Sequence, residues 1–275
     1  EPVGRRDLVR PIRAVGTVQF DERRTFVIST RFEGWIEKLL VNATGQTVRR
    51  GQPLMQVYSP DLVLAQQEYA LLSTSARGDG RADGESAATR RLLEGAEQRL
   101  RYLDFPLPEM ERLKREAQAR EIVTIPSPVS GTVIEKPALQ GMRFMPGETL
   151  YKIVDMSTVW LIAEVFEQDL ATVTVGQPAK IVVKAYPERS FAGRIAFIYP
   201  TVGGQTRTAR VRIEISNPGD LLKQEMYAGV EIASPVGRRD VLAIPDSAVI
   251  DNGIRQVVLI DRGEGRFEPR PRRML

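Results

Sequence analysis

The sequence contains neither histidine nor cysteine, so methionines and carboxylates are the side chains left that could bind a metal ion. Met142 and Met145 lie three residues apart in the segment GMRFMPG. Two thioethers on one side of a turn could hold a soft ion such as Cu(I) or Ag(I) transiently. Methionine also fills irregular apolar gaps well, so both residues could instead pack into the core. The sequence leaves both interpretations open.

The missing residue types exclude most common catalytic chemistry. Ser-His-Asp and Cys-His catalysis, thiolate or imidazole zinc sites, iron–sulfur clusters and disulfides all need histidine or cysteine. No Walker loop, dinucleotide fingerprint or paired-carboxylate motif is present. Glu164, Glu167 and Asp169 could bind a divalent ion, although a solvated rim of carboxylates is the simpler interpretation. We therefore expect a protein that is not an enzyme and has no resident cofactor.

The composition is that of a globular protein able to bury a core. The chain has 275 residues, 42% of them hydrophobic and 27% charged, with a net charge of +4. Its arginines are scattered and form no basic stripe interleaved with aromatic residues, so we expect no nucleic acid partner. No apolar run approaches the roughly 20 residues that span a bilayer. We expect any membrane anchor to lie outside this chain.

An internal repeat organises the first half of the chain. Each copy has a strand that begins at a glycine, then two glycine turns, then a leucine. The matched pairs are Gly34 with Gly131, Gly45 with Gly141, Gly51 with Gly147, and Leu54 with Leu150. Glycine supplies the positive φ that tight turns between short strands require. Copies this short cannot each bury a face alone, so we expect them to pair into one small sandwich.

A helical insert separates the two copies. Residues 59–61 (Ser-Pro-Asp) are typical of a helix start, with an N-cap serine, a proline at the first position and an acidic residue. The polar, glycine-rich segment 73–85 predicts an exposed loop. A second helix is expected to end at 104–108, and a third to cover 109–120. Three short amphipathic helices in series predict a small bundle.

The second half of the chain is predicted to be all β. Alternating apolar residues indicate strands over 159–165, 179–183 and 211–215. Residues 167–171 predict one short helix at the end of a barrel. A single strand is predicted over 15–28, and it must pair with a distant, C-terminal part of the chain.

Eight segments in the chain carry a family resemblance. They are 34–39 (GWIEKL), 58–60 (YSP), 65–69 (AQQEY), 159–161 (VWL), 167–170 (EQDL), 206–208 (TRT), 217–218 (NP) and 244–249 (IPDSAV). Together they resemble the heavy-metal, CusB-like group of periplasmic adaptors, also called membrane fusion proteins. The split repeat likewise resembles the two halves of a lipoyl-type domain separated by a helical insert.

The resemblance implies a fold that is mainly β with an α-helical insert, in an elongated, nested, multi-domain adaptor. The expected modules are a membrane-proximal β domain (1–14 plus 237–275), a β-barrel (15–28 plus 157–236), a split lipoyl-like sandwich (29–58 plus 121–156) and a short helical bundle (59–120). A lipoyl- or biotinyl-type carrier subunit is a remoter alternative. It would need a lysine at an exposed hairpin tip, where this chain has the helical insert.

The implied function is export of heavy-metal cations of the Cu/Ag or the Zn/Co/Cd class. In such systems of the resistance-nodulation-division (RND) class, the adaptor forms a ring, expected to be hexameric, between a proton-driven inner-membrane pump and an outer-membrane channel. The implied location is the periplasm, associated with the inner membrane. An adaptor for organic solutes or secreted proteins is the alternative.

Two segments are candidate partner contacts. Arg99, Leu100 and Leu103 match the Arg-Leu-x-x-Leu tip by which drug-exporting adaptors engage the outer channel, and an amphipathic helix face with an extended arginine gives the same pattern. A second set follows the flexible pair Gly203-Gly204 and could face the pump or a neighbouring subunit, or form a plain β-turn. Its members are Thr206, Arg207 and Thr208.

The sequence departs from the family at the turn 223–226. This turn reads Lys-Gln-Glu-Met where the family has Lys-Pro-Gly-Met. No methionine precedes Met55, so the methionine cluster near the family's N-terminus has no counterpart in this chain.

Overall fold

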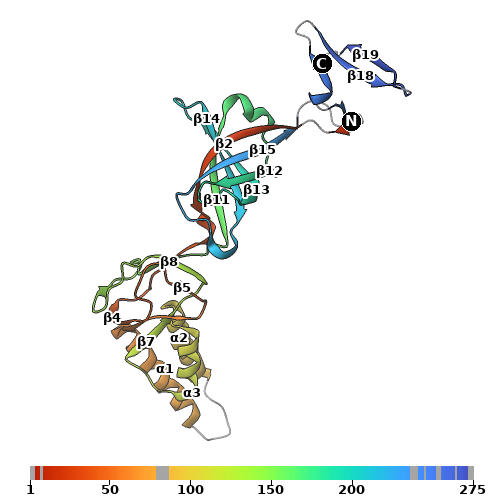
Figure 1. Cartoon of the computed structure of the whole chain (residues 1–275). Helices are drawn as coiled ribbons and strands as arrows, with labels where there is room; N and C mark the ends of the chain where they lie inside the picture. The colour runs from red at the N-terminus through yellow and green to blue at the C-terminus, as the bar shows by residue number, and fades with distance from the viewer. Residues whose placement is uncertain are drawn as a thin grey trace. The chain divides into compact units, whose positions relative to one another are not determined.

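A computed structural model describes residues 4–6, 9–78, 87–235, 241–244, 246–251, 255–263 and 265–271 (Figure 1). The chain divides into two compact units. The barrel unit comprises 1–19, 160–216 and 222–275, and the sandwich unit comprises 20–159 and 217–221. Among the described helices, none is long and apolar enough to cross a membrane.

The sandwich unit contains two four-stranded antiparallel sheets. One sheet has the order β3 (Thr25–Ile28), β10 (Tyr151–Val154), β8 (Gly131–Glu135) and β5 (Thr47–Val48). The other has the order β7 (Ile122–Pro126), β6 (Pro53–Tyr58), β4 (Gly34–Leu39) and β9 (Arg143–Phe144). The two repeat copies exchange strands, because β5 of the first pairs with β8 of the second and β9 of the second pairs with β4 of the first. The predicted joint sandwich is confirmed.

The glycine turns make this exchange reciprocal. All four repeat glycines of the turns have φ between +80° and +84°. The amide of Gly45 donates to the carbonyl of Val133 at 2.7 Å, and the amide of Gly141 donates to the carbonyl of Ile36 at 2.7 Å. Ile36 and Val133 are matched positions of the two copies. Each copy therefore closes its turn on the other copy.

A buried tyrosine marks the centre of the sandwich core. Tyr151 is fully buried, and its hydroxyl donates to the carbonyls of Val41 at 2.9 Å and Leu54 at 3.3 Å. Burial disfavours the charged phenolate and raises the pKa of Tyr151 to about 12. The matched leucines Leu54 and Leu150 are fully buried nearby in the same core.

Three helices form the insert, as predicted: α1 (Pro60–Gly78), α2 (Ala87–Tyr102) and α3 (Leu107–Glu116) (Figure 1). The amide of Leu62 donates to the hydroxyl of Ser59 at 3.4 Å, which confirms the predicted N-cap. The prediction of a loop from residue 73 is wrong, because α1 continues to Gly78. The hydroxyls of Ser73 and Thr74 donate to the carbonyl of Ala70, so these polar side chains are satisfied within the helix.

The third helix is shorter than the predicted span 109–120. It ends at Glu116, because Ala117 adopts a left-handed conformation (φ 53°, ψ 32°) and its amide donates to the carbonyl of Leu113. The following segment, 117–121, leads back to β7 without helical structure. The rest of the predicted loop 73–85, from residue 79 onward, lies outside the described residues.

The barrel unit contains a closed six-stranded barrel. Its strands follow the order β11 (Thr158–Phe166), β14 (Thr208–Ser216), β13 (Ser190–Val202), β12 (Pro178–Val183), β15 (Tyr227–Pro235) and β2 (Val9–Phe20). The three strands predicted from alternation are β11, β12 and β14. The predicted short helix is the 3-10 helix η2 (Glu167–Thr172).

The single strand predicted over 15–28 is wrong. Asp21 ends β2 and caps the 3-10 helix η1 (Glu22–Arg24), since its buried carboxylate accepts the amide of Arg23 at 3.0 Å. Strand β2 pairs with β15 in the barrel, whereas β3 pairs with β10 in the sandwich. Residues 9–14 therefore join the barrel and 25–28 join the sandwich, in contrast to the predicted module boundaries.

Short elements follow near the chain ends. Strand β1 (Gly4–Arg6) pairs with β16 (Val241–Ala243). A three-stranded sheet contains β17 (Val249–Asp251), β18 (Gln256–Asp261) and β19 (Phe267–Pro271), and it follows the 3-10 helix η4 (Asp246–Ala248). A further 3-10 helix, η3 (Pro218–Asp220), follows β14.

Candidate functional site

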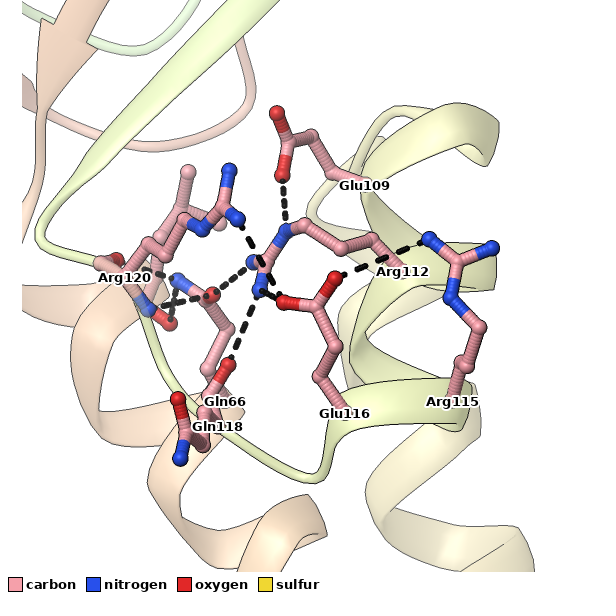
Figure 2. Close-up of polar contacts among 8 residues, drawn as sticks. Gln66, Glu109, Arg112, Arg115, Glu116, Gln118 and Arg120 are labelled. Carbon is pink, nitrogen blue, oxygen red and sulfur yellow. Dashed lines mark hydrogen bonds and ion pairs between the residues drawn. The ribbon is translucent and has the colours of Figure 1, made fainter.

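The candidate site residues lie at four places: a polar network in the helical bundle, the end of α2, the second glycine turn of the sandwich, and the β13–β14 hairpin of the barrel. The network centres on Arg112, whose side chain is only 8% exposed. Its Nε donates to Glu109 at 2.8 Å, and its Nη1 donates to Glu116 at 3.2 Å and to the carbonyl of Gln118 at 3.1 Å (Figure 2). Its Nη2 lies 3.5 Å from the Oε1 atom of Gln66.

The other centre of this network is Gln66, which lies in the AQQEY segment. Its side chain is fully buried, and Nε2 donates to the carbonyls of Leu62 at 3.1 Å and Arg120 at 3.0 Å. Its Oε1 accepts the amide of Arg120 at 3.1 Å. Hydrogen bonding from Arg112, with added attraction from Arg120, lowers the pKa of Glu116. The network fastens α3 and the returning segment to α1, which makes it architectural.

Sequence reasoning missed the Gln66–Arg112 network. Arg112 lies in α3 and Gln66 in α1, 46 residues apart in sequence, so no local spacing connects them. In the sequence, the available indication was the position of Gln66 between Ala65 and Tyr69, two residues of α1 that the structure buries. A fully buried amide must find hydrogen-bond partners, and the returning backbone supplies them.

The predicted tip contact at the end of α2 is not supported. Leu100 is fully buried in the core, and Leu103 packs against that core. Arg99 is half-exposed and forms an ion pair with Glu68 at 3.0 Å. The end of α2 also lies beside the sandwich, since Asp104 pairs with an arginine of the strand β3–β4 connection, Arg31, at 2.6 Å. The amphipathic helix face explains the pattern.

The two methionines face different surroundings. Met142 packs against the core, and its carbonyl accepts the amide of Ile36 at 2.9 Å. Met145 is half-exposed. Between them, β9 has an exposed Arg143 and a buried Phe144, so strand alternation puts Met142 and Met145 on opposite faces. Within the described residues, no cluster of three or more acidic side chains could hold a metal ion.

The β13–β14 hairpin exposes two residues of the predicted set Thr206, Arg207 and Thr208, namely Thr206 and Arg207. Arg207 has φ 50° and a side chain that is 75% exposed, 3.7 Å from Glu167. Thr208 is buried, and its hydroxyl donates to Glu164 at 3.3 Å. The hydroxyls of Thr206 and Thr208 lie 2.8 Å apart. The two threonine hydroxyls therefore bond within the hairpin, and Arg207 is the charged residue of the set that is available to a partner.

An open cleft adjoins Arg207. It is lined by Phe166, Glu167, Gln168 and Arg207, and the amide of Glu167 donates to the carbonyl of Arg207 at 3.0 Å. Phe166 is 53% exposed at the end of β11. An exposed aromatic ring beside an exposed guanidinium is typical of protein-binding surfaces. Of the three carboxylates proposed above as ligands for a divalent ion, Glu164 is engaged locally by Thr208 and Glu167 by Arg207, whereas Asp169 lies in η2.

Two family descriptions match this fold in consecutive parts of the chain. Residues 25–154 match the "CusB, barrel-sandwich hybrid domain", and residues 158–236 match the "CusB-like, beta-barrel domain". These ranges correspond to the exchanged sandwich with its helical insert and to the closed barrel without its strand β2. The chain therefore belongs to the CusB-like membrane fusion proteins.

Similar proteins agree with this assignment. The chain is 30% identical over 253 residues to the membrane fusion protein SilB of Salmonella typhimurium. The aligned region covers 92% of this chain and 56% of SilB. It is 28% identical to the cation efflux system protein CusB of Escherichia coli (strain K12), covering 92% of this chain and 59% of CusB. The chain thus spans little more than half the length of these relatives.

A solved structure shares the fold. The crystal structure of ZneB from Cupriavidus metallidurans is 22% identical and has a TM-score of 0.52, covering 82% of this chain and 99% of that chain. The mainly β fold with its helical insert is thereby confirmed.

Proposed function

We propose that this chain is the periplasmic adaptor of a heavy-metal efflux system of the RND class. The observation that carries the proposal is the succession of a CusB-like sandwich with a helical insert and a CusB-like barrel. Its relative CusB is described as a cation efflux system protein, which favours metal cations over organic solutes or secreted proteins as the cargo.

The proposed role is mechanical. The adaptor holds an inner-membrane pump and an outer-membrane channel in register, and copies of the chain assemble into a ring, expected to be hexameric. The exchanged sandwich suits this role, because each repeat copy completes the sheets of the other and the module resists local opening. In this proposal the chain carries no catalysis, and the metal ion is cargo.

The experiment that tests this function is deletion of the gene in its host, followed by measurement of growth in Cu(I), Ag(I), Zn(II) and Co(II) and in a panel of organic toxicants. We expect sensitivity to one class of metal ion, restored by the full-length gene. Sensitivity confined to the organic toxicants would support the alternative cargo. Unchanged growth in all conditions would contradict the efflux role.

Metal binding by the chain itself remains a prediction that rests on Met142 and Met145. Anaerobic native mass spectrometry with Cu(I), Ag(I), Zn(II) and Co(II) tests it, with the Met142→Ile/Met145→Ile variant as control. A soft ion retained by the wild type and lost by the variant would support transfer through these thioethers. Retention of no ion would contradict the prediction and would leave Met142 as a residue packed against the core and Met145 as a surface residue.

A further inference from the structure

A ladder of aromatic rings and guanidinium groups lies on the outer face of the barrel. It consists of Trp160 of β11, Arg210 and Arg212 of β14, and Phe197 and Tyr199 of β13. The guanidinium of Arg212 lies 4.2 Å from the Trp160 ring and 5.3 Å from the Phe197 ring. That of Arg210 lies 4.9 Å from the Tyr199 ring. Phe197 and Tyr199 meet edge to face at 5.2 Å.

Sheet geometry explains why these side chains meet. In the barrel order, β14 lies between β11 and β13. Its inward residues 209, 211, 213 and 215 are buried, so Arg210 and Arg212 point outward. Phe197 is directly opposite Arg212 in the β13–β14 register, which shifts between Ile195 and Phe197. This irregularity sets the aromatic residues of β13 beside the two arginines.

Neither of the two arginines, Arg210 and Arg212, has a carboxylate bound to it in the described part of the chain. Among the described residues, the buried Nε of Arg212 also has no hydrogen-bond acceptor. Stacking on rings occupies the flat faces of a guanidinium and leaves its outer Nη–H donors free to bind an anion, whereas the Nε of Arg212 is buried. Two residues apart on a strand, the guanidinium-bearing positions are about 7 Å apart.

We propose that this arginine–aromatic ladder is a docking surface for a partner protein, whose bound segment is extended and presents two carboxylates on alternate residues. An extended strand repeats its side chains every two residues, about 7 Å apart, which matches the spacing of Arg210 and Arg212. Phe197, 41% exposed, offers apolar contact beside the charges, whereas Trp160, 3% exposed, lies beneath Arg212 and supports it. Tyrosine and arginine are among the residues that most often dominate binding energy in protein interfaces. The proposal rests on the adaptor function and names the chemistry of one partner.

The surroundings favour a protein segment over a broad anionic surface. Glu164 on β11 is exposed, and Glu214 on β14 is half-buried beside Arg212 in the same outward row. A membrane of anionic lipids or a nucleic acid would bring its charges against these carboxylates as well. A segment with two discrete carboxylates can pair with the arginines alone, which gives electrostatic complementarity at this position.

The experiment uses Trp160 as its reporter. In a Trp35→Phe background Trp160 is the remaining one of the chain's two tryptophans, and its ring stacks on Arg212. The probe is the peptide acetyl-Thr-Glu-Val-Glu-Thr-amide, and its control is the same peptide with glutamine in place of glutamate. We expect a saturable change in fluorescence with the acidic peptide and at least tenfold weaker binding of the glutamine peptide.

Charge-matched variants distinguish binding of the peptide at the ladder from general electrostatic attraction of the peptide to the protein. Arg210→Gln/Arg212→Gln should weaken binding of the acidic peptide at least tenfold, whereas Arg10→Gln/Arg13→Gln, at two exposed positions of β2, should leave it unchanged. Arg210→Lys/Arg212→Lys keeps the charge but not the planar fork, and we expect it to weaken binding severalfold. The lysine variant also serves if the glutamine variant does not fold.

Several outcomes would overturn the proposal. They are equal binding of both peptides, equal loss in the β2 control variant, or no binding at millimolar peptide. Binding to phosphatidylglycerol vesicles in place of the peptide would assign the surface to lipid. A dimer that sediments as a monomer after Arg210→Gln/Arg212→Gln would assign it to a second copy. Loss of metal tolerance on gene deletion, with no peptide binding, would reject the ladder and leave the adaptor function intact.

Discussion

Gly45 and Val133 are joined by a 2.7 Å backbone hydrogen bond across 88 residues of sequence, and the bond from Gly141 to Ile36 repeats it in the other direction. The whole helical insert lies between the residues of the first bond. Because each bond closes a turn of one copy on a strand of the other, neither copy can complete its fold alone. The insert can therefore vary in length while the sandwich that holds it stays the same.

We expect Gly45→Ala to destabilise the sandwich through backbone strain. Gly45 has φ +84°, and a Cβ there would meet nothing within 4 Å. The left-handed conformation should then account for the whole loss, about 1–2 kcal/mol. Gly45→Asn should lose less, because asparagine tolerates this conformation. Urea unfolding followed by the fluorescence of Trp35 measures both variants.

Gly131 provides the contrasting case. A Cβ there would lie 2.5 Å from the carbonyl oxygen of Val154, so Gly131→Ala should cost about 2–3 kcal/mol through a steric clash. At this position Gly131→Asn should lower the unfolding free energy more than Gly131→Ala, which reverses the order expected at Gly45. The same order at both positions would show that one mechanism operates at both glycines.

Leu100→Ala should destabilise the helical bundle, because Leu100 is a core residue and not a residue that contacts a partner. The side chain is fully buried, so its removal should cost about 2–4 kcal/mol. Arg99→Ala, which removes a half-exposed ion pair, should change stability by less than about 0.5 kcal/mol. Urea unfolding followed by circular dichroism at 222 nm tests the pair. A stable Leu100→Ala protein would restore the tip-contact interpretation.

The sequence predicts the sandwich well because its glycines mark turns that few other residues can form. The repeat spacing places four turns with positive φ, and Ser59 places the start of α1. Alternation likewise identifies β11, β12 and β14, whose apolar residues face a closed barrel. Local chemistry fixes each of these features within a few residues, so sequence reasoning reaches them.

The features that sequence reasoning misses depend on distant partners. Asp21 divides one apolar stretch into two strands that enter different units. Arg112 meets Gln66 through folding of α3 onto α1. Leu100 lies in a motif that fits a surface contact, yet the packing of α2 buries it. In each case the tertiary environment, and not the local spacing, decides the role of the residue.

Arg112→Ala should destabilise the bundle strongly. It removes the donor that serves Glu109, Glu116 and the carbonyl of Gln118, and it leaves the largely buried Glu109 without its arginine, while Glu116 keeps Arg115 and Arg120. The expected loss is about 3 kcal/mol. Arg115→Ala is the matched control, because this arginine of α3 is 74% exposed and should contribute less than about 0.5 kcal/mol. Equal effects of the two variants, measured by urea unfolding, would contradict a special role for Arg112.

Asp21→Asn should make stability less dependent on pH. Burial alone would raise the pKa of Asp21, but hydrogen bonds from Arg23 outweigh it and lower the pKa below its ordinary value of 3.8. A carboxylate with a lowered pKa stabilises the fold above pH 3.8, and this contribution is lost as the pH falls through the lowered value. The difference in unfolding free energy between wild type and Asp21→Asn should be about 1–2 kcal/mol at pH 7 and should shrink below pH 3.8. A difference that is constant from pH 7 to pH 2.5 would contradict this account.

Glu225→Gly should stabilise the barrel. The turn 223–226 lacks the Pro-Gly pair of the family, yet Glu225 adopts φ 66° and its amide donates to the carbonyl of Val18 at 2.9 Å. A glutamate held in the left-handed region is strained, and glycine removes that strain, so we expect a gain of about 1 kcal/mol. Gln224→Gly is the matched control, because Gln224 does not have positive φ and glycine there should only raise the entropy of the unfolded chain. Thermal unfolding should therefore show a higher midpoint for Glu225→Gly and a lower one for Gln224→Gly, and a shift in the same direction for both would contradict the assigned strain.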